Sequence, residues 1–581
     1  MKCCMVILLL VVMGYGSPDQ TVNWLAALGN TCCAEESPLL NADQLFVRGH
    51  LVDVQIILAD KDWKTLCQQT RVIAHSLGKT PAESPFTYFK GEVTIDGVQI
   101  KNVGIRKKGF LGSLSNVRPS LKIKFQEYQK QQPIAGIDRL TLNNNQQDRS
   151  LASQFLGYHF FNQTGTIAPR SNHARITVNG NYLGIYTNVE SVRPQLLKTR
   201  FGSSTGDLYE GTVADVFPDT LQRFELKTRK TKIDPLQGLA RALEETPLDL
   251  ATLDTMIDIK SFVRYWATES LLGFWDGYTN NQNNFFVYHN PRNSKLYFIP
   301  WGLDSAFTSG MPLPPFFIKI KSVHCQSALS NLLYREPKIQ QMYRDTLLTL
   351  LKDHWNEATL ITELDAIEAR VGEHLHESQQ DFHKSVERIR KFIQKRRTVI
   401  ENELKEWPVS LSTGPRNPIY FKVIGQATAD FSSTWHAETP KNPFKVGKLD
   451  LTFSYQDKPL VFKNNAGGVF SELSKDNRGG ERSPTVVIIG EREPDGKQII
   501  LAVGVPSEAF QPGMGKPVTV QGFYIEGKTE GISAIFARPK LEAVAGFVYL
   551  EEASMEPGAP VKGKLELKVL KMTGGKPRPV K

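Results

Sequence analysis

Three polar residues, Asp276, Asn284 and Asp304, bracket two short apolar runs in the middle of the chain. Asp276 precedes a group of asparagines, Asn284 stands directly before the first apolar run, and Asp304 follows the second. Carboxylate and amide oxygens are ligands that Mg²⁺ and Mn²⁺ prefer, and a positioned carboxylate can accept a proton from a hydroxyl group. These residue types suit metal-assisted phosphoryl transfer, with Asp276 as the proton acceptor and Asn284 and Asp304 as metal ligands.

The segment that carries these residues, 273–307, has the pattern of a β-hairpin. Two aromatic-rich runs flank a turn at 289–294 that contains Asn, Pro, Arg and Ser. A hairpin places the three polar residues at strand ends, where their side chains can converge on one site. The apolar spacing over 259–272 predicts a helix that leads directly to Asp276.

Upstream of the hairpin, the sequence predicts two strands joined by a loop that contains glycine and serine, between Arg106 and Lys122. Such a loop can present backbone N–H groups to phosphates, and Lys122 on the second strand can point at the same phosphates. We therefore count Arg106 and Lys122 as candidate nucleotide contacts. The alternative is a plain surface hairpin that happens to carry lysines.

Glu190 is a further candidate for the nucleotide site. It ends the second strand of a predicted hairpin whose turn is Asn179-Gly180, a dipeptide suited to a tight turn. A carboxylate at this point could orient a lysine or hold a metal. The alternative is an exposed residue at the start of the next helix, where the helix dipole favours a negative charge.

Length and charge limit the classes of function. A chain of 581 residues with a net charge of +10 is long enough for two or three domains. The positive charge is dispersed, so it suits an anionic substrate or surface and does not require nucleic acid.

The composition changes at Trp407-Pro408, and short alternating runs beyond it predict a β-sandwich over 407–581. This region has no cysteine and no cluster of catalytic residue types. We expect it to bind a polysaccharide or a surface partner.

The N-terminal end predicts export. Residues 1–17 contain one basic residue, an apolar core and small residues at the end, as a signal peptide does, and residues 18–45 read as a leader. Removal of the signal peptide leaves four cysteines: Cys32, Cys33, Cys67 and Cys325. They permit two disulfides in three pairings, and the absence of CxxC spacing makes a zinc site the weaker alternative. We expect a secreted, periplasmic or cell-surface protein without a transmembrane segment.

Several motifs together resemble the CotH kinase family, secreted atypical protein kinases named for a spore coat protein. The matching pieces are VGIRKKG with SLKIKF, LTLNN with DRS, VNGNYLGIYTNVE, GDLYEG, and FWDGYTNNQNNFFVY with FIPWGLD. They follow one another over roughly residues 50–400. The resemblance implies an α+β fold with an atypical protein-kinase-like domain over 46–406. It also implies ATP with Mg²⁺ or Mn²⁺ as cofactors, and Ser or Thr of exported proteins as substrates.

The resemblance implies a role for each candidate residue. Asp276 resembles the catalytic aspartate of the family, Asp304 its metal-binding aspartate, and Asn284 the companion ligand. Lys122 resembles the lysine that contacts the nucleotide. Glu190 resembles an acidic position of a family motif.

Three positions depart from the expected patterns. The family usually shows Pro-Trp-Asp-x-Asp, and the first of these aspartates is Gly302 here. Arg118 stands where many relatives have lysine, and Asn281 rather than Asn284 keeps the five-residue step from Asp276 found in kinases. The alternative function is therefore an inactive kinase-like scaffold with a C-terminal binding module. A glycoside hydrolase with paired carboxylates fits less well, because asparagines dominate the hairpin.

Overall fold

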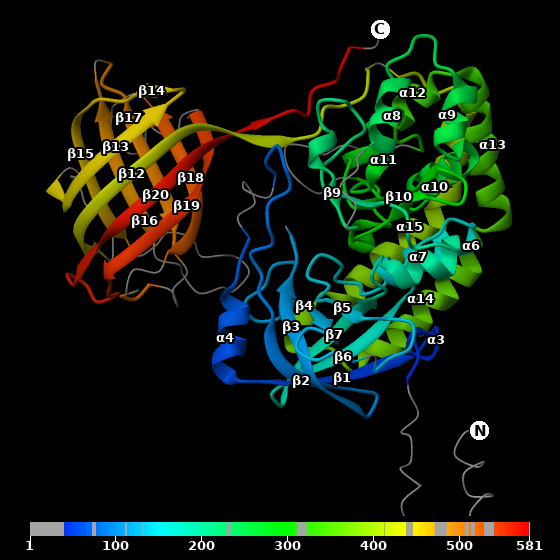
Figure 1. Cartoon of the computed structure of the whole chain (residues 1–581), viewed down its shortest axis with the longest axis horizontal. Coiled ribbons are helices and arrows are strands. Elements are labelled where there is room, and N and C mark those ends of the chain that lie inside the picture. The colour runs from blue at the N-terminus through cyan, green and yellow to red at the C-terminus, as the bar shows by residue number, and fades with distance from the viewer. Residues whose placement is uncertain are drawn as a thin grey trace, which may run out of the picture.

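The computed structural model describes residues 40–71, 77–110, 113–131, 133–228, 234–310, 322–411, 413–436, 445–470, 485–493, 495–505, 510–512, 517–527 and 540–579 (Figure 1). The predicted signal peptide, most of the predicted leader, and Cys32 and Cys33 lie outside the described residues. In the described part of the chain, no helix combines the length and apolar character needed to cross a membrane.

The first part of the fold is a closed barrel of seven strands. The strands are β1 (Leu51–Leu58), β2 (Phe89–Ile95), β3 (Val98–Lys108), β4 (Ser120–Lys124), β5 (Arg139–Asn143), β6 (Ser171–Val178) and β7 (Asn181–Val189). Their order is β1-β2-β3-β4-β5-β7-β6, and a parallel pairing of β1 with β6 closes the barrel. Alternate residues of β1 are buried, as expected for a strand with one face on a core. Two short helices, α3 (Ala42–Leu45) and α4 (Asp60–Gln68), accompany the barrel.

The second part consists of helices around a four-stranded sheet of order β11-β10-β8-β9. Its strands are β8 (Leu208–Gly211), β9 (Glu225–Leu226), β10 (Phe285–Asn290) and β11 (Lys295–Pro300). Its helices are α6 (Ser153–Gln163), α7 (Pro194–Phe201), α8 (Asp234–Ala242), α9 (Leu250–Met256), α10 (Ile259–Leu271), α11 (Tyr278–Asn281), α12 (Ala328–Tyr334), α13 (Pro337–Asp353), α14 (Glu357–Gly372) and α15 (Phe382–Glu403). The predicted hairpin within 273–307 is confirmed, because β10 and β11 pair antiparallel with Phe285 opposite Pro300.

The C-terminal part is built from nine strands in one sheet. They are β12 (Tyr420–His436), β13 (Lys448–Tyr455), β14 (Lys458–Pro459), β15 (Phe462–Phe470), β16 (Thr485–Arg492), β17 (Gln498–Gly504), β18 (Val518–Gly527), β19 (Lys540–Glu552) and β20 (Pro560–Thr573). The α+β class and the all-β C-terminal region are confirmed. The described strands form a single sheet that closes on itself, because β12 pairs with β20 on one side and with β13 and β15 on the other. Long twisted strands can bring the two edges of a sheet together in this way, without a second sheet.

The two described cysteines do not pair with each other. Cys67 on α4 and Cys325 are both free and buried. Burial raises the pKa of the Cys67 thiol to about 11.

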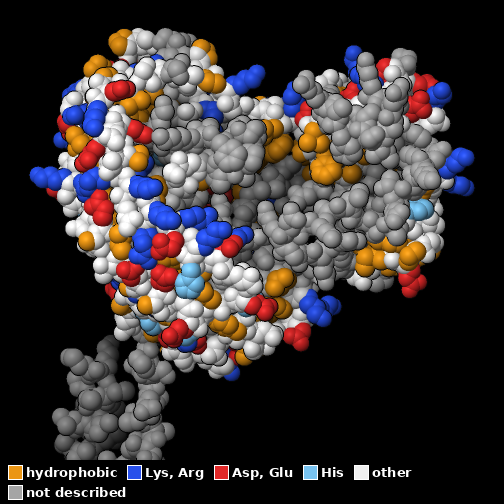
Figure 2. Space-filling view, turned by 180° about the vertical axis from the view of Figure 1, so that it is seen from behind, with side chains coloured by type: hydrophobic (Ala, Val, Ile, Leu, Met, Phe, Trp, Pro, Cys, Tyr) orange, Lys and Arg blue, Asp and Glu red, His pale blue; other side chains and the backbone are white. Residues whose placement is uncertain are grey.

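Charged side chains are mixed on the surface. On the face drawn in Figure 2, Lys and Arg lie among Asp and Glu rather than in one isolated basic patch. This distribution agrees with the dispersed positive charge of the sequence.

Candidate active site

Asp276 lies in the turn after α10 and is held by three asparagines. The Nδ2 atoms of Asn281, Asn283 and Asn284 donate hydrogen bonds to its carboxylate at 2.6, 3.1 and 2.8 Å. Burial raises the pKa of Asp276, and the three amide donors oppose that effect. The asparagine-rich sequence therefore fixes the orientation of a single carboxylate.

Asp304 lies on the 3₁₀ turn η2 (Leu303–Ser305) that follows β11. Asn143 at the end of β5 donates to its Oδ2 at 3.4 Å, which links the barrel to the hairpin. Burial raises the pKa of Asp304 to about 7, with further contributions from the negative charges of Asp276 and Asp148. The negative charges of Asp276 and Asp148 therefore act on Asp304 near the contact between the barrel and the helical part, and an acidic neighbourhood favours a bound cation.

Gly302 lies against Asn284. Its φ is +55°, and a Cβ atom at this position would lie 2.8 Å from Asn284 Oδ1. The backbone N–H of Trp301 also donates to the carbonyl of Asn284 at 3.0 Å. The close approach and the left-handed backbone both favour glycine here. Asn284 is thereby placed between Asp276 and the turn that carries Asp304.

The oxygen donors fit a hard divalent cation with few protein ligands. Within the described ranges, no group of three or more His, Cys, Asp or Glu side chains is arranged as a complete metal site. Mg²⁺ commonly takes one or two carboxylates and completes its shell with water and substrate phosphates. Asp304 and the amide oxygen of Asn284 match that partial donor set.

A cluster of cations lies beside the carboxylates. Lys122 on β4 is paired in register with Arg106 on β3. Burial lowers the pKa of Lys122 well below its usual value, and the positive charges of Arg106, Arg193, Lys108 and Arg139 lower it further. A partly buried lysine among other cations suits a phosphate chain, whose negative charge would compensate them.

Lys108 connects the cation cluster with the carboxylates. Burial lowers the pKa of Lys108 to about 8, while the negative charges of Asp304 and Glu210 act in the opposite direction. The structure therefore brings Lys122, Arg106 and Asp304 into one electrostatic neighbourhood.

Glu190 has a different environment. Its carboxylate accepts hydrogen bonds from Nε and Nη2 of Arg170 at 2.9 and 2.8 Å, and from the backbone N–H of Arg170 at 3.1 Å. These contacts give Glu190 a structural role between the ends of β6 and β7. Its contact with a nucleotide stays a prediction.

Glu210 on β8 is a carboxylate near the cation cluster that sequence reasoning missed. It forms an ion pair of 2.5 Å with Lys227. Burial alone would raise its pKa, but the pair with Lys227 and the charges of Lys122 and Arg193 outweigh burial and lower it. Glu210 belongs to the GDLYEG motif, which is one of the pieces that carry the family resemblance and could have pointed to this residue.

Two other buried residues, Asp148 and Arg118, support elements around the site. Asp148 is buried and accepts a hydrogen bond from the backbone N–H of Ser153, the first residue of α6, at 2.8 Å, while its negative charge raises the pKa of Asp304. Arg118 donates from Nε to the carbonyl of Leu183 at 2.5 Å and therefore supports β7. The DRS and SLKIKF motifs point to these regions without showing the contacts.

Comparison with known proteins places the chain in one family. The family model described as "CotH kinase protein" matches residues 105–400, just over half of the chain. The chain is 22% identical to "Inner spore coat protein H" of Bacillus subtilis (strain 168), over 38% of this chain and 71% of that protein. It is 23% identical to "Invasin CotH3" of Rhizopus delemar (strain RA 99-880), over 30% of this chain and only 32% of that protein. This chain belongs to the CotH kinase protein family.

Proposed function

We propose that this protein is a metal-dependent kinase that transfers the γ-phosphate of ATP to Ser or Thr of exported proteins. One observation carries the proposal: Asn284 donates a hydrogen bond to Asp276 at 2.8 Å and packs against Gly302, two residues before Asp304, so both aspartates flank one asparagine. The cations around Lys122 lie near this acidic group, since Lys108 senses the charge of Asp304. An acidic centre next to a basic cluster is what metal-assisted phosphoryl transfer needs.

In this proposal each residue has a defined task. Asp276 accepts the proton of the substrate hydroxyl and is kept in position by its asparagine donors. Asp304 and Asn284 would hold Mg²⁺ or Mn²⁺, which supplies positive charge against the phosphate oxygens. Lys122 and Arg106 bind the phosphates, and the charge of Glu210 limits the repulsion among the cations.

A second candidate is an inactive scaffold of the same fold. It is favoured by Gly302, which occupies the position of the first aspartate of the family pattern and is closely packed on Asn284. In that case the C-terminal sheet would carry the function by binding a polysaccharide or a surface protein.

The names of the relatives support a location outside the cell. One relative is named an inner spore coat protein and another an invasin. We propose that this chain likewise acts in a secreted, periplasmic or surface compartment on exported protein partners.

The experiment combines the purified full chain, γ-labelled ATP, Mg²⁺ or Mn²⁺, and a serine-rich acidic acceptor protein. We expect label in the acceptor from the wild type and a loss of at least about 100-fold in Asp276→Asn and Asp304→Asn. The exposed Asp345→Asn on α13 serves as the matched control. Equal labelling by Asp304→Asn and wild type would contradict the assignment. A scaffold would bind neither ATP nor Mn²⁺, and its melting temperature would not rise when both are added.

A further inference from the structure

The C-terminal tail returns to the part of the molecule that carries the candidate site. Residues 413–419 lead from the helical part to β12, and residues 574–579 follow β20 and lie antiparallel to them (Figure 1). The backbone N–H of Asn417 donates to Lys576 at 2.9 Å, and that of Arg578 donates to Pro415 at 2.7 Å. We call these two segments together the strap.

Arg416 connects the strap to the asparagine loop. Its Nη2 donates to Asn281 Oδ1 at 2.8 Å, and its Nε donates to Gln282 Oε1 at 3.2 Å. Asn281 in turn donates through Nδ2 to Asp276 at 2.6 Å. The amide of Asn281 is therefore oriented from both sides, with its oxygen on Arg416 and its nitrogen on Asp276.

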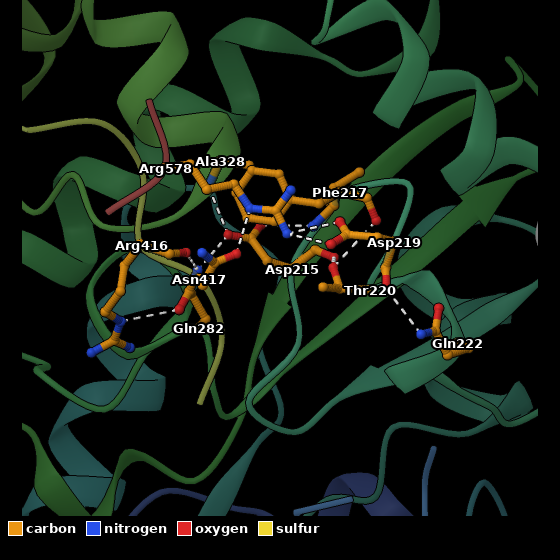
Figure 3. Close-up of polar contacts among 11 residues, drawn as sticks. Asp215, Phe217, Asp219, Thr220, Gln222, Gln282, Ala328, Arg416, Asn417 and Arg578 are labelled. Atoms are coloured by element: carbon orange, nitrogen blue, oxygen red, sulfur yellow. Dashed lines mark hydrogen bonds and ion pairs between the residues drawn. The ribbon is translucent and has the colours of Figure 1, made fainter. Parts of the chain in front are cut away.

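A second set of hydrogen bonds, made by Gln282 and Asp215, holds the turn that contains α11. Gln282 Nε2 donates to the backbone carbonyl of Arg416 and to Asp215 Oδ2, both at 2.6 Å. Asp215 is fully buried and also accepts a hydrogen bond from Tyr278 OH at 2.9 Å. The backbone N–H of Ala328 donates to Asp215 at 2.7 Å (Figure 3). The strap is thus a member of the network that holds α11.

Arg578 fastens the strap. Its Nη2 contacts both carboxylate oxygens of Asp219 at 2.7 and 2.9 Å, and its Nε donates to Asn417 Oδ1 at 2.5 Å. Its guanidinium carbon lies 3.8 Å from the centre of the Phe217 ring (Figure 3). These contacts hold Asn417, the neighbour of Arg416, against the helical part.

We propose that Arg416 is a positioning residue for Asp276, and that the C-terminal tail keeps Arg416 in place through Arg578. The C-terminal domain therefore completes the asparagine loop of the same chain. This inference rests on the proposed function only for its effect on catalysis; its effect on the loop stands on the contacts themselves.

The test uses the full chain with Arg416→Gln and Arg578→Gln. Arg335→Gln is the matched control, because in the described structure Arg335 bonds the strap at Thr413 and α12 at Asn331 rather than α11. Hydrogen exchange is measured at Asn281 and Gln282, whose N–H groups bond Gly277 and Tyr278 within the turn. We expect exchange about tenfold faster in both variants and unchanged in the control.

Steady-state kinetics provide the second readout. We expect kcat to fall about tenfold in Arg416→Gln with KM for ATP within about twofold of wild type, since the cations that bind phosphate lie on the barrel. The variant that combines Arg416→Gln with Arg578→Gln should have the same kcat as Arg416→Gln alone, because Arg578 acts through Arg416. Unchanged exchange in both variants, or an equal increase in Arg335→Gln, would overturn the inference. A wild type without kinase activity would refute the proposed function and leave the exchange result to decide the inference.

Discussion

Replacing Asp304 by Asn should stabilise the metal-free protein while removing its response to metal. The folded structure raises the pKa of Asp304 from 3.8 to about 7, first through burial and then through Asp276 and Asp148. Between these pH values the folded protein therefore binds more protons than the unfolded chain. The free energy of unfolding of wild type falls as the pH rises through this window. Asparagine does not titrate, so the free energy of unfolding of Asp304→Asn does not fall for this reason.

The difference in stability between Asp304→Asn and wild type follows from the shift in the pKa of Asp304. A rise of about 3 pKa units corresponds to about 4 kcal/mol at most, because one unit is worth about 1.4 kcal/mol. Asp304 is partly exposed, so solvent screening reduces the effect, and we expect Asp304→Asn to be about 1–3 kcal/mol more stable than wild type at pH 8. The two proteins should have similar stability near pH 4.

The assay is urea unfolding in EDTA at pH 4 and pH 8, followed by thermal unfolding with and without Mn²⁺. Wild type should gain stability with Mn²⁺, and Asp304→Asn should gain much less. Asp345→Asn, an exposed substitution on α13, controls for the loss of one negative charge. If Asp304→Asn is less stable than wild type at pH 8 in EDTA, the carboxylate serves the fold rather than a cation, and the reasoning fails.

Three further substitutions test other parts of the site and core. Gly302→Ala should destabilise the protein by about 1–3 kcal/mol and lower kinase activity, because the left-handed backbone and the contact with Asn284 leave no room for Cβ. Urea unfolding measures the change in stability, and an unchanged free energy of unfolding would argue against the close packing. Lys122→Met should raise KM for ATP at least about tenfold, and an unchanged KM in steady-state assays would remove Lys122 from the site. Burial lowers the pKa of His173 from 6.5 to about 4, so the unfolded chain binds the proton more tightly than the folded protein. Wild type should therefore lose up to about 3 kcal/mol of stability as the pH falls from 6.5 to 4. His173→Gln should remove this loss in unfolding at pH 4.5 and 7, and an unaltered pH dependence would count against it.

Much of the fold around the site could be predicted from local patterns. Alternating apolar residues and the dipeptide Asn179-Gly180 predicted the hairpin that became β6 and β7. Aromatic runs around a polar turn predicted β10 and β11. These patterns are informative because strand periodicity and turn chemistry act over neighbouring residues, and their spacing is written directly in the sequence.

The partners of individual charges could not be predicted in the same way. Local patterns do not distinguish Glu210 from Glu190 as the carboxylate near Lys122, because Glu210 lies within β8 and Glu190 directly follows β7. In the folded protein, Glu190 pairs with Arg170 at the barrel, whereas Glu210 in the β8 sheet pairs with Lys227. Burial, which dominates the pKa of each group, is likewise a property of the assembled core.

The family resemblance, the hairpin, and the order of Asp276, Asn284 and Asp304 could all be recognised in the amino-acid sequence. The contact of Asn143 with Asp304 across 161 positions, and that of Arg416 with Asn281 across 135, became visible in the folded chain alone. The physical reason is that local propensity fixes short segments, whereas contacts between distant segments depend on how the whole chain packs. The candidate site is formed by such distant contacts, and its last support comes from the opposite end of the chain.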